Sequence, residues 1–384
     1  MRPRLGQLFL AFLRLGATAF GGPSTVAYMR RLVVDRRAWL STGEFDDGVA
    51  LCQAIPGSTA MQTAAYVGLR ARGVAGAGMS FIGFGLPSFL LMLALSQMYS
   101  RAHGLPMVVA AFSGLRALIV GLVANAAVSF GKSSLRHWPH AVIAALAAAL
   151  FGLGWNPVVV IVLAAGAGWA LVRRTVVDSG DPAIQPALPA TLKPVMLVLA
   201  VAGLGLGALA LVDRQLAALA ALMIRIDLFA FGGGFASVPL MYHEVVGIRH
   251  WLAGPTLLDG IVLGQVTPGP IVITATFIGD QLRGWIGGAL ATAAVFLPSF
   301  LILVAAAPYF DRLRGSTTFA RLIGGVLCSF VGLLVAVTVQ LAHNVSWTWV
   351  HILLATAAFV ALRFRVDVLW VVAAGTVLSV MLCR

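Results

Sequence analysis

Charge and cysteine are both scarce in this 384-residue sequence. Charged residues make up 10% of the chain, hydrophobic residues make up 60%, and the mean hydropathy is +0.97, whereas an average soluble domain is roughly 25% charged. The composition therefore excludes an ordinary soluble domain. Cys52, Cys328 and Cys383 lie in apolar sequence without CxxC spacing, so we expect neither a disulfide framework nor a metal site and interpret them as small buried residues.

Motifs for catalysis and cofactor binding are missing as well. The sequence contains no GxSxG, HExxH or paired-carboxylate pattern. Gly131-Lys132-Ser133-Ser134 imitates the end of a phosphate-binding loop, but Ala126 stands where that motif needs its first glycine. His137 and His140 have the spacing of metal ligands but no acidic or cysteine companion. We therefore expect no enzyme, no cofactor and no metal.

Long uncharged runs are what the sequence has instead. Each is close to or above the ~20 residues that a helix needs to span a bilayer. The clearest runs cover residues 48–69, 73–100, 194–212, 260–279 and 284–310. They predict an all-α polytopic membrane protein.

The net charge of +13 comes from 26 Lys and Arg against 13 Asp and Glu. In a soluble protein this balance would indicate a nucleic-acid partner. Here the arginines lie in short connections between apolar runs, where they are typical of membrane topology. The expected partner is therefore the lipid bilayer and not nucleic acid.

The sequence repeats itself at a shift of 211 or 212 residues. Arg, Trp, Asp, Gln, Pro and Gly residues all recur in this one register, which indicates a duplication. The matches include Arg14 with Arg225, FGG at 20–22 with 231–233, Gln53 with Gln265, Pro56-Gly57 with Pro268-Gly269, and LPSFL at 86–90 with 297–301. We predict a first repeat at 1–172, a polar linker with an unpaired apolar helix at 173–214, and a second repeat at 215–384.

Each repeat reads as six helical segments, of which the first two are interrupted by glycine or proline and the last two are short. Two topologies are open. If every segment crosses, seven crossings separate the repeat starts and the second repeat is inverted. If residues 44–70 dip in and return, the arginine clusters share one face instead. We favour inverted repeats.

The glycine and proline breaks are the first candidate for function. A broken helix exposes N–H and C=O groups that lipid cannot satisfy, so it must line protein or a watery cavity. A helix that restarts after such a break offers free N–H groups to an anion; close helix packing is the alternative explanation of Gly-Gly. Duplication favours a binding site between the repeats. The candidate positions are Gly21, Gly22, Pro56, Gly57, Gly232, Gly233, Pro268 and Gly269.

Two arginines and two glutamines accompany the breaks. Arg14 and Arg225 lie about two helical turns before each FGG in apolar sequence, where they either extend to the membrane surface or face an anion with their forked donors. Gln53 and Gln265 precede each Pro-Gly by three residues and supply neutral amide donors.

Three acids remain. Asp47 and Asp259 are a repeated pair that we interpret as solvated acids near helix starts, with proton coupling as the alternative. Asp227 lies two residues after Arg225 and is a candidate to balance it, whereas Gly16 occupies the same place in the first repeat.

With FGGP, the two Gln-x-x-Pro-Gly motifs, the LPSFL pair and two homologous halves, the sequence resembles the chromate ion transporter (CHR) family in its long, two-domain form. The resemblance covers nearly the whole chain. It implies a multi-pass protein of the bacterial inner membrane that exports chromate and confers chromate tolerance. Ser58 stands where Pro270 completes PGP, and Gly234 stands where Pro23 completes FGGP, so the halves need not contribute equally.

The residues alone predict a secondary transporter for a small anion, bound between the halves and moved by alternating access. Chromate and sulfate are both tetrahedral dianions, so sulfate or another oxyanion stays open. A passive anion channel would use the same donors. A membrane enzyme would need clustered acid, base or metal ligands, which the sequence lacks. Nothing in the sequence decides for or against a homodimer.

Overall fold

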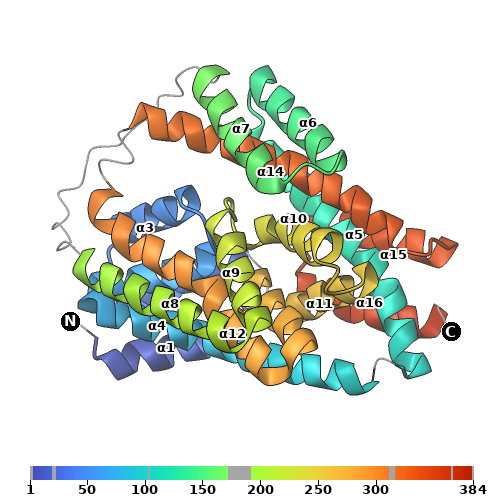
Figure 1. Ribbon diagram of the computed structural model, residues 1–384, viewed down its shortest axis with the longest axis horizontal. Coiled ribbons are helices and arrows are strands. Elements are labelled where there is room, and N and C mark those ends of the chain that lie inside the picture. Colours follow the sequence, from blue (N-terminus) through green and yellow to red (C-terminus); the bar gives the residue numbers. More distant parts are fainter. Residues whose placement is uncertain are drawn as a thin grey trace.

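The structure is a computed structural model that describes residues 3–19, 23–102, 104–171, 192–310, 316–364 and 366–382. Its regular elements there are all helices (Figure 1). The first repeat contains α1 (Leu5–Thr18), α2 (Pro23–Arg30), the π-helix η1 (Arg31–Arg36), α3 (Thr42–Ala54), α4 (Thr59–Ala102), α5 (Pro106–Ser134), α6 (Trp138–Gly152) and α7 (Pro157–Leu171). The helix α8 (Leu192–Val212) follows.

The second repeat contains the matching elements. They are α9 (Arg214–Leu228), η2 (Gly234–Ala236), α10 (Ser237–Met241), the π-helix η3 (Tyr242–Ile248), α11 (Gly254–Val266), η4 (Ile271–Ile273), α12 (Thr274–Ala306), η5 (Ala307–Tyr309), α14 (Thr317–His343), α15 (Trp349–Arg363) and α16 (Val368–Leu382). Both repeats thus place a π-helix and a broken helix in the same order. The part of the predicted linker at 173–191 lies outside the described residues.

In the described part of the chain, five helices are long and apolar enough to cross a membrane. They are Thr59–Ala102, Pro106–Ser134, Lys193–Val212, Ile271–Tyr309 and Thr317–His343. The shorter apolar helices α6, α7, α15 and α16 have 15 residues each, about 22 Å at 1.5 Å per residue, less than the ~30 Å hydrocarbon core. The prediction of an all-α polytopic membrane protein is confirmed.

The helix breaks at Pro56-Gly57 and Pro268-Gly269 reverse the chain. Glu44 in the first turn of α3 binds Arg70 near the end of the next segment, with Oε1 and Nη2 2.6 Å apart. Gly48 faces the Tyr66 ring, and Gly260 faces the Phe277 ring in the second repeat. The segment around 44–70 therefore folds back on itself, as the dip-and-return alternative from the sequence requires.

A second reversal follows at Arg72-Gly73, inside α4. Gly73 has φ +64° and ψ −157°, and its counterpart Gly284 in α12 has φ +62° and ψ −159°. Beyond the turn the chain packs back on itself, since a side chain at Gly68 would meet Gly76 O at 2.1 Å. The two repeats thus share an unusual backbone conformation that only glycine adopts easily.

Matching helices of the two repeats run in opposite directions. Along α5 and α14, Gly131 lies against Val331 and Ser134 O lies 3.7 Å from the sulfur of Cys328, so one residue number rises as the other falls. Both helices are long enough to span a membrane. The repeats are therefore inverted, and the structure combines this arrangement with the dipping segments that the sequence treated as its alternative.

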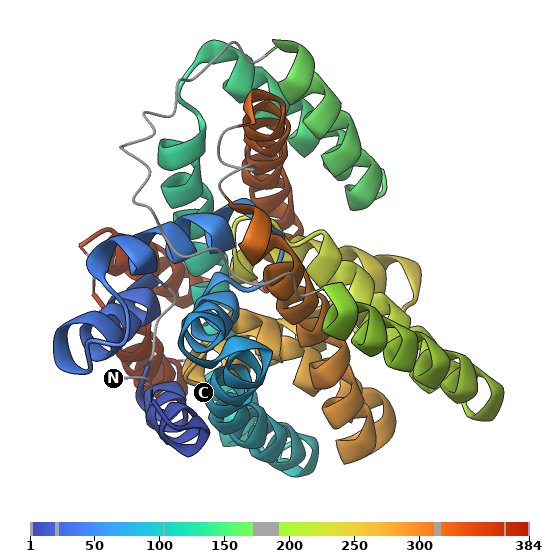
Figure 2. The same ribbon diagram turned by 90° about the vertical axis from the view of Figure 1, so that its left-hand side faces the viewer.

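The last two helices of each repeat pack against the other repeat. The hairpin α6–α7 lies on α14, and α15–α16 lies on α5 (Figures 1 and 2). Glycines let the backbones approach: a side chain at Gly121 would meet Ala355 O at 2.3 Å, and one at its counterpart Gly332 would meet Ala144 O at 2.1 Å. The two repeats of the sequence are thus not two separate bodies in space.

Candidate functional site

The two Pro-Gly breaks meet the opposite repeat at the centre of the molecule. Gly57 N–H donates to Ala230 O at 2.9 Å, and Gly269 N–H donates to Ala19 O at 3.1 Å. These bonds are equivalent under the repeat, and the glycines have φ +115° and +107°, where a side chain would be strained. Both N–H groups are therefore occupied in this conformation and can reach an anion only after these contacts open.

The second FGG motif lies beside this crossing. Gly232 and Gly233 have φ +83° and +96°, and within the described part of the chain their N–H groups make no backbone hydrogen bond. A side chain at Gly233 would come 3.6 Å from Thr59 Oγ1 at the start of α4, and one at Gly234 would meet Ile271 at 2.6 Å. Gly233 thus lies next to a helix N-terminus, the positive end of its dipole, whereas Gly232 faces Leu327 and Phe130. Gly21 and Gly22 lie outside the described residues.

The LPSFL motifs tie the same centre together. Ser58 N–H donates to Ser299 Oγ at 3.1 Å, and Ser88 Oγ donates to Pro268 O. Each motif serine therefore binds the Pro-Gly break of the other repeat. The sequence marked LPSFL only as a sign of duplication, and its unchanged repetition at 86–90 and 297–301 was the signal that could have identified Ser88 and Ser299.

Asp227 and Gln62 approach Ser299 from opposite repeats, and both are 0% exposed. Asp227 Oδ2 accepts the Ser299 N–H at 2.7 Å. Gln62 Nε2 donates to Pro56 O at 2.6 Å and reaches Ser299 O at 3.5 Å. The remaining oxygens, Asp227 Oδ1 and Gln62 Oε1, are buried and have no hydrogen-bond partner among the described residues.

Arg225 binds an acid other than Asp227. Its Nη1 lies 3.2 Å from Glu244 Oε1 and its Nη2 lies 3.3 Å from Asn156 Oδ1 in the turn between α6 and α7. The interpretation that Asp227 balances Arg225 is therefore wrong: two residues along a helix place side chains on different faces. Arg14 lies on an exposed face of α1. The anion role of both arginines stays a prediction.

The two predicted glutamines lie in unlike surroundings. Gln53 is exposed near the end of α3. Gln265 is half-buried near the end of α11, and its Nε2 is a buried donor without a partner in the described residues. Only Gln265 thus presents an unused donor close to its Pro-Gly break, and the role of both residues stays a prediction.

Asp259 is buried, with 1% exposure, so its interpretation as a solvated acid is wrong. Arg116 of the first repeat binds both carboxylate oxygens at 2.7 Å, and Tyr99 Oη donates at 2.8 Å. The sequence could not show this pairing because Arg116 is 143 residues away. Leu327 stands at the position equivalent to Arg116, and Asp47 is half-buried, so the duplicated acids now differ in their surroundings.

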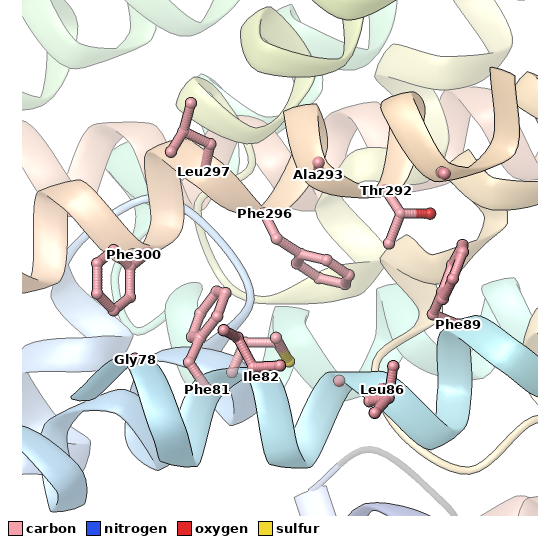
Figure 3. A pocket seen from close by; sticks show the side chains of 13 residues that line it. Gly78, Phe81, Ile82, Leu86, Phe89, Thr292, Ala293, Phe296, Leu297 and Phe300 are labelled. Atoms are coloured by element: carbon pink, nitrogen blue, oxygen red, sulfur yellow. The ribbon is translucent and has the colours of Figure 1, made fainter. Parts of the chain in front are cut away.

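A cavity of about 530 Å³ lies between α4 and α12. Figure 3 shows aromatic side chains from both helices converging on it, including Phe81, Phe89, Phe296 and Phe300. Thr292 is the one hydroxyl-bearing residue of its lining. An apolar wall offers a dianion no compensation for its lost hydration, so this cavity is not the anion site.

Two of the three cysteines can be placed. Cys52 and Cys328 are buried and form no disulfide, which confirms their interpretation as small buried residues. Cys383 lies outside the described residues.

Two inverted, interlocked repeats of broken helices around a polar centre define a polytopic membrane protein of the transporter class. Comparison with known families gives a more specific assignment. The family profile described as chromate transporter matches residues 6–169 and again residues 217–380, so the chain belongs to the chromate transporter family.

The relatives agree with this membership. An uncharacterized transporter of Methanocaldococcus jannaschii is 40% identical, over 98% of this chain and 94% of its own. Chromate transport proteins of Pseudomonas aeruginosa and Cupriavidus metallidurans are 33% and 31% identical, each over 88% of this chain and over 81% and 83% of their own. No solved structure gives a significant match.

Proposed function

We propose that this protein is a secondary transporter that exports chromate across the bacterial inner membrane by alternating access and so confers chromate tolerance. The observation that carries the proposal is at the centre: among the described residues the N–H groups of Gly232 and Gly233 make no backbone hydrogen bond, and Gly233 lies beside the N-terminus of α4 from the other repeat. Two relatives named as chromate transport proteins support chromate as the substrate.

The donor set suits a tetrahedral oxyanion. Backbone N–H groups and the N-terminus of a helix can bind the oxygens of an oxyanion through hydrogen bonds and partial positive charge, without a cationic side chain. In the proposed site Arg14 and Arg225 add charge-assisted donors, and Gln53 and Gln265 add neutral ones. In the proposed cycle the Pro56-Gly57 and Pro268-Gly269 breaks open and close access. The N–H groups of Gly57 and Gly269 are bonded across the repeats in this conformation, so access to them requires the repeats to separate there. Sulfate has the same shape and charge and is the alternative substrate.

The acids Asp47 and Asp259 stay predictions as coupling groups. Asp259 is held by two donors of Arg116, and this bidentate geometry favours the ionised form. The ion pair of Asp259 with Arg116 therefore favours a structural role, which is to join the two repeats, over a role in proton transfer.

Chromate uptake into everted inner-membrane vesicles tests the function. We expect energised vesicles that contain the protein to accumulate chromate above the external concentration, sulfate to compete, and an uncoupler to abolish accumulation. Vesicles without the protein are the control. Equilibration without accumulation would indicate a passive channel, and accumulation of sulfate in preference to chromate would reassign the substrate.

A further inference from the structure

The buried carboxyl of Asp227 has no role in the function described so far. We propose that Asp227 is the proton-binding group of this transporter: its carboxyl is protonated in the present conformation, and the proton moves together with the anion. The proposal rests on the proposed transport function and adds the coupled ion and its site.

The first argument is the environment of the carboxyl. Asp227 is 0% exposed, and within the described residues its hydrogen-bond donors come from one residue, Ser299: the N–H lies 2.7 Å from Oδ2, and the side chain is a second partner. Oδ1 is buried without a partner in the described residues. A buried carboxylate with so little compensation is costly to ionise, so the neutral acid is the form that fits this place, with its proton on Oδ1.

The second argument is the lack of a neutralising cation. No cationic side chain in the described part of the chain forms an ion pair with Asp227. The charged and titratable groups on the elements around α9 are engaged elsewhere or exposed. The ion pairs are Arg225 and Arg249 with Glu244, Arg283 with Asp213, and Arg70 with Glu44. Asp280 accepts hydrogen bonds from Ser96 and Gln97, and Arg72 donates to Pro3 O. His243 lies beside the Phe151 ring, and Lys193 is exposed at the start of α8.

The third argument is a second oxygen that lacks a donor. Gln62 points its amino group at two carbonyl oxygens, Pro56 O and Ser299 O, so its orientation is fixed and Oε1 is the atom without a partner. Two buried acceptors, Asp227 Oδ1 and Gln62 Oε1, thus belong to side chains that contact the same residue. A proton on Asp227 adds a donor beside Ser299, around which two side chains have an acceptor without a partner in the described residues.

The connection to the anion site is short. Asp227 binds Ser299, and Ser299 Oγ binds the Ser58 N–H directly before α4. An ionised Asp227 would place negative charge near the helix N-terminus that is proposed to receive the anion. Anion binding and protonation therefore favour each other. One dianion and one proton move the same way, and the net charge of −1 carried outward is driven by an inside-negative potential.

Only the second repeat can carry this group. The equivalent position in α1 is Gly16, where a side chain would meet Phe84 O at 2.2 Å. The first repeat therefore has no room for a carboxyl here, and one proton per anion is the expected stoichiometry.

The test uses the full-length protein in liposomes, with the membrane potential held at zero by potassium and valinomycin. An inward proton gradient of one pH unit should drive about tenfold chromate accumulation by the wild type. Asp227→Asn, which mimics the protonated acid, should exchange chromate across the membrane at equilibrium but accumulate none. Asp227→Glu should recover accumulation. Asp280→Asn, a second buried acid with neutral partners, is the matched control and should accumulate as the wild type does.

The outcomes separate the two proposals. If the wild type exchanges no chromate, the proposed function is wrong. If the wild type transports chromate and Asp227→Asn still accumulates it about tenfold, or if a sodium gradient replaces the proton gradient, the Asp227 proposal is wrong. Should Asp227→Asn fail to assemble, infrared spectra of the wild type decide: we expect a protonated carboxyl band at neutral pH that moves in Asp227→Glu, and its absence overturns the proposal.

Discussion

The ion pair between Arg116 and Asp259 gives the sharpest stability prediction. The change is Arg116→Leu, which copies Leu327 of the second repeat. Asp259 is 1% exposed and accepts two bonds from Arg116 and one from Tyr99. After the change, Asp259 keeps one of these three hydrogen bonds, the one from Tyr99, in a site that is almost inaccessible to water.

The size of the effect follows from this burial. Breaking a buried pair by removing one partner costs roughly 3–5 kcal/mol, because the other charge is left uncompensated. The Arg116 side chain is itself 29% exposed, so solvent screening places the expected loss near the lower end of that range. Because most of the loss reflects the stranded carboxylate, Arg116→Leu combined with Asp259→Asn should recover much of it.

The measurement is equilibrium unfolding in mixed detergent and SDS micelles, followed by tryptophan fluorescence. Arg101→Ala is the control: Arg101 is exposed near the end of α4, and we expect a change within about 0.5 kcal/mol. A loss below about 1 kcal/mol for Arg116→Leu, or a double variant that is less stable than Arg116→Leu, would refute the reasoning that Asp259 is a buried ion that depends on Arg116.

Further predictions address the anion site and the close helix contacts. Arg14→Ala and Arg225→Ala should each abolish chromate export while the protein stays in the membrane at wild-type amounts; wild-type export by both would remove the arginines from the site. Gly57→Ala should cost more than about 2 kcal/mol, since its φ is +115° and a side chain would lie 2.0 Å from Ser299 Oγ. Gly6→Ala, with nothing within 4 Å, should cost nothing in the same unfolding assay. Gly121→Leu should displace α15 and lower the amount of folded protein, as size-exclusion chromatography in detergent would show.

Local patterns predicted the membrane class, the duplication and the places where helices break. A membrane helix is recognised from the hydropathy of about 20 consecutive residues, and glycine or proline changes the backbone at its own position. Both features can therefore be predicted from neighbouring residues alone. The inverted orientation was also favoured from the sequence. The return of the chain at Pro56-Gly57 stayed open because it depends on which residues meet across the break, such as Glu44 with Arg70.

The site was less accessible to sequence reasoning because its contacts join distant residues. Asp227 acts on Ser299, 72 positions away, and its nearest charged neighbour in sequence, Arg225, suggested a different partner. Repetition was also misleading. Asp47 and Asp259 match in sequence, but only Asp259 is buried, where it is paired with Arg116 of the first repeat. Equivalent residues in a duplicated chain keep equivalent backbone and diverge in what surrounds their side chains.

The exchanged hairpins decide which parts of the molecule can move as one. Because α6–α7 packs on α14 and α15–α16 packs on α5, a rotation of residues 1–172 as a rigid body would tear both hairpins from their partners. Under the proposed alternating access, the bodies that would move are mixed bundles instead, each built from the long helix of one repeat and the hairpin of the other. The hydrogen bonds from the Pro-Gly breaks to the opposite repeat lie outside both bundles, among the ends of α1, α3, α9 and α11. The bodies that pack as units in this protein therefore differ from the two halves that duplication produced in the sequence.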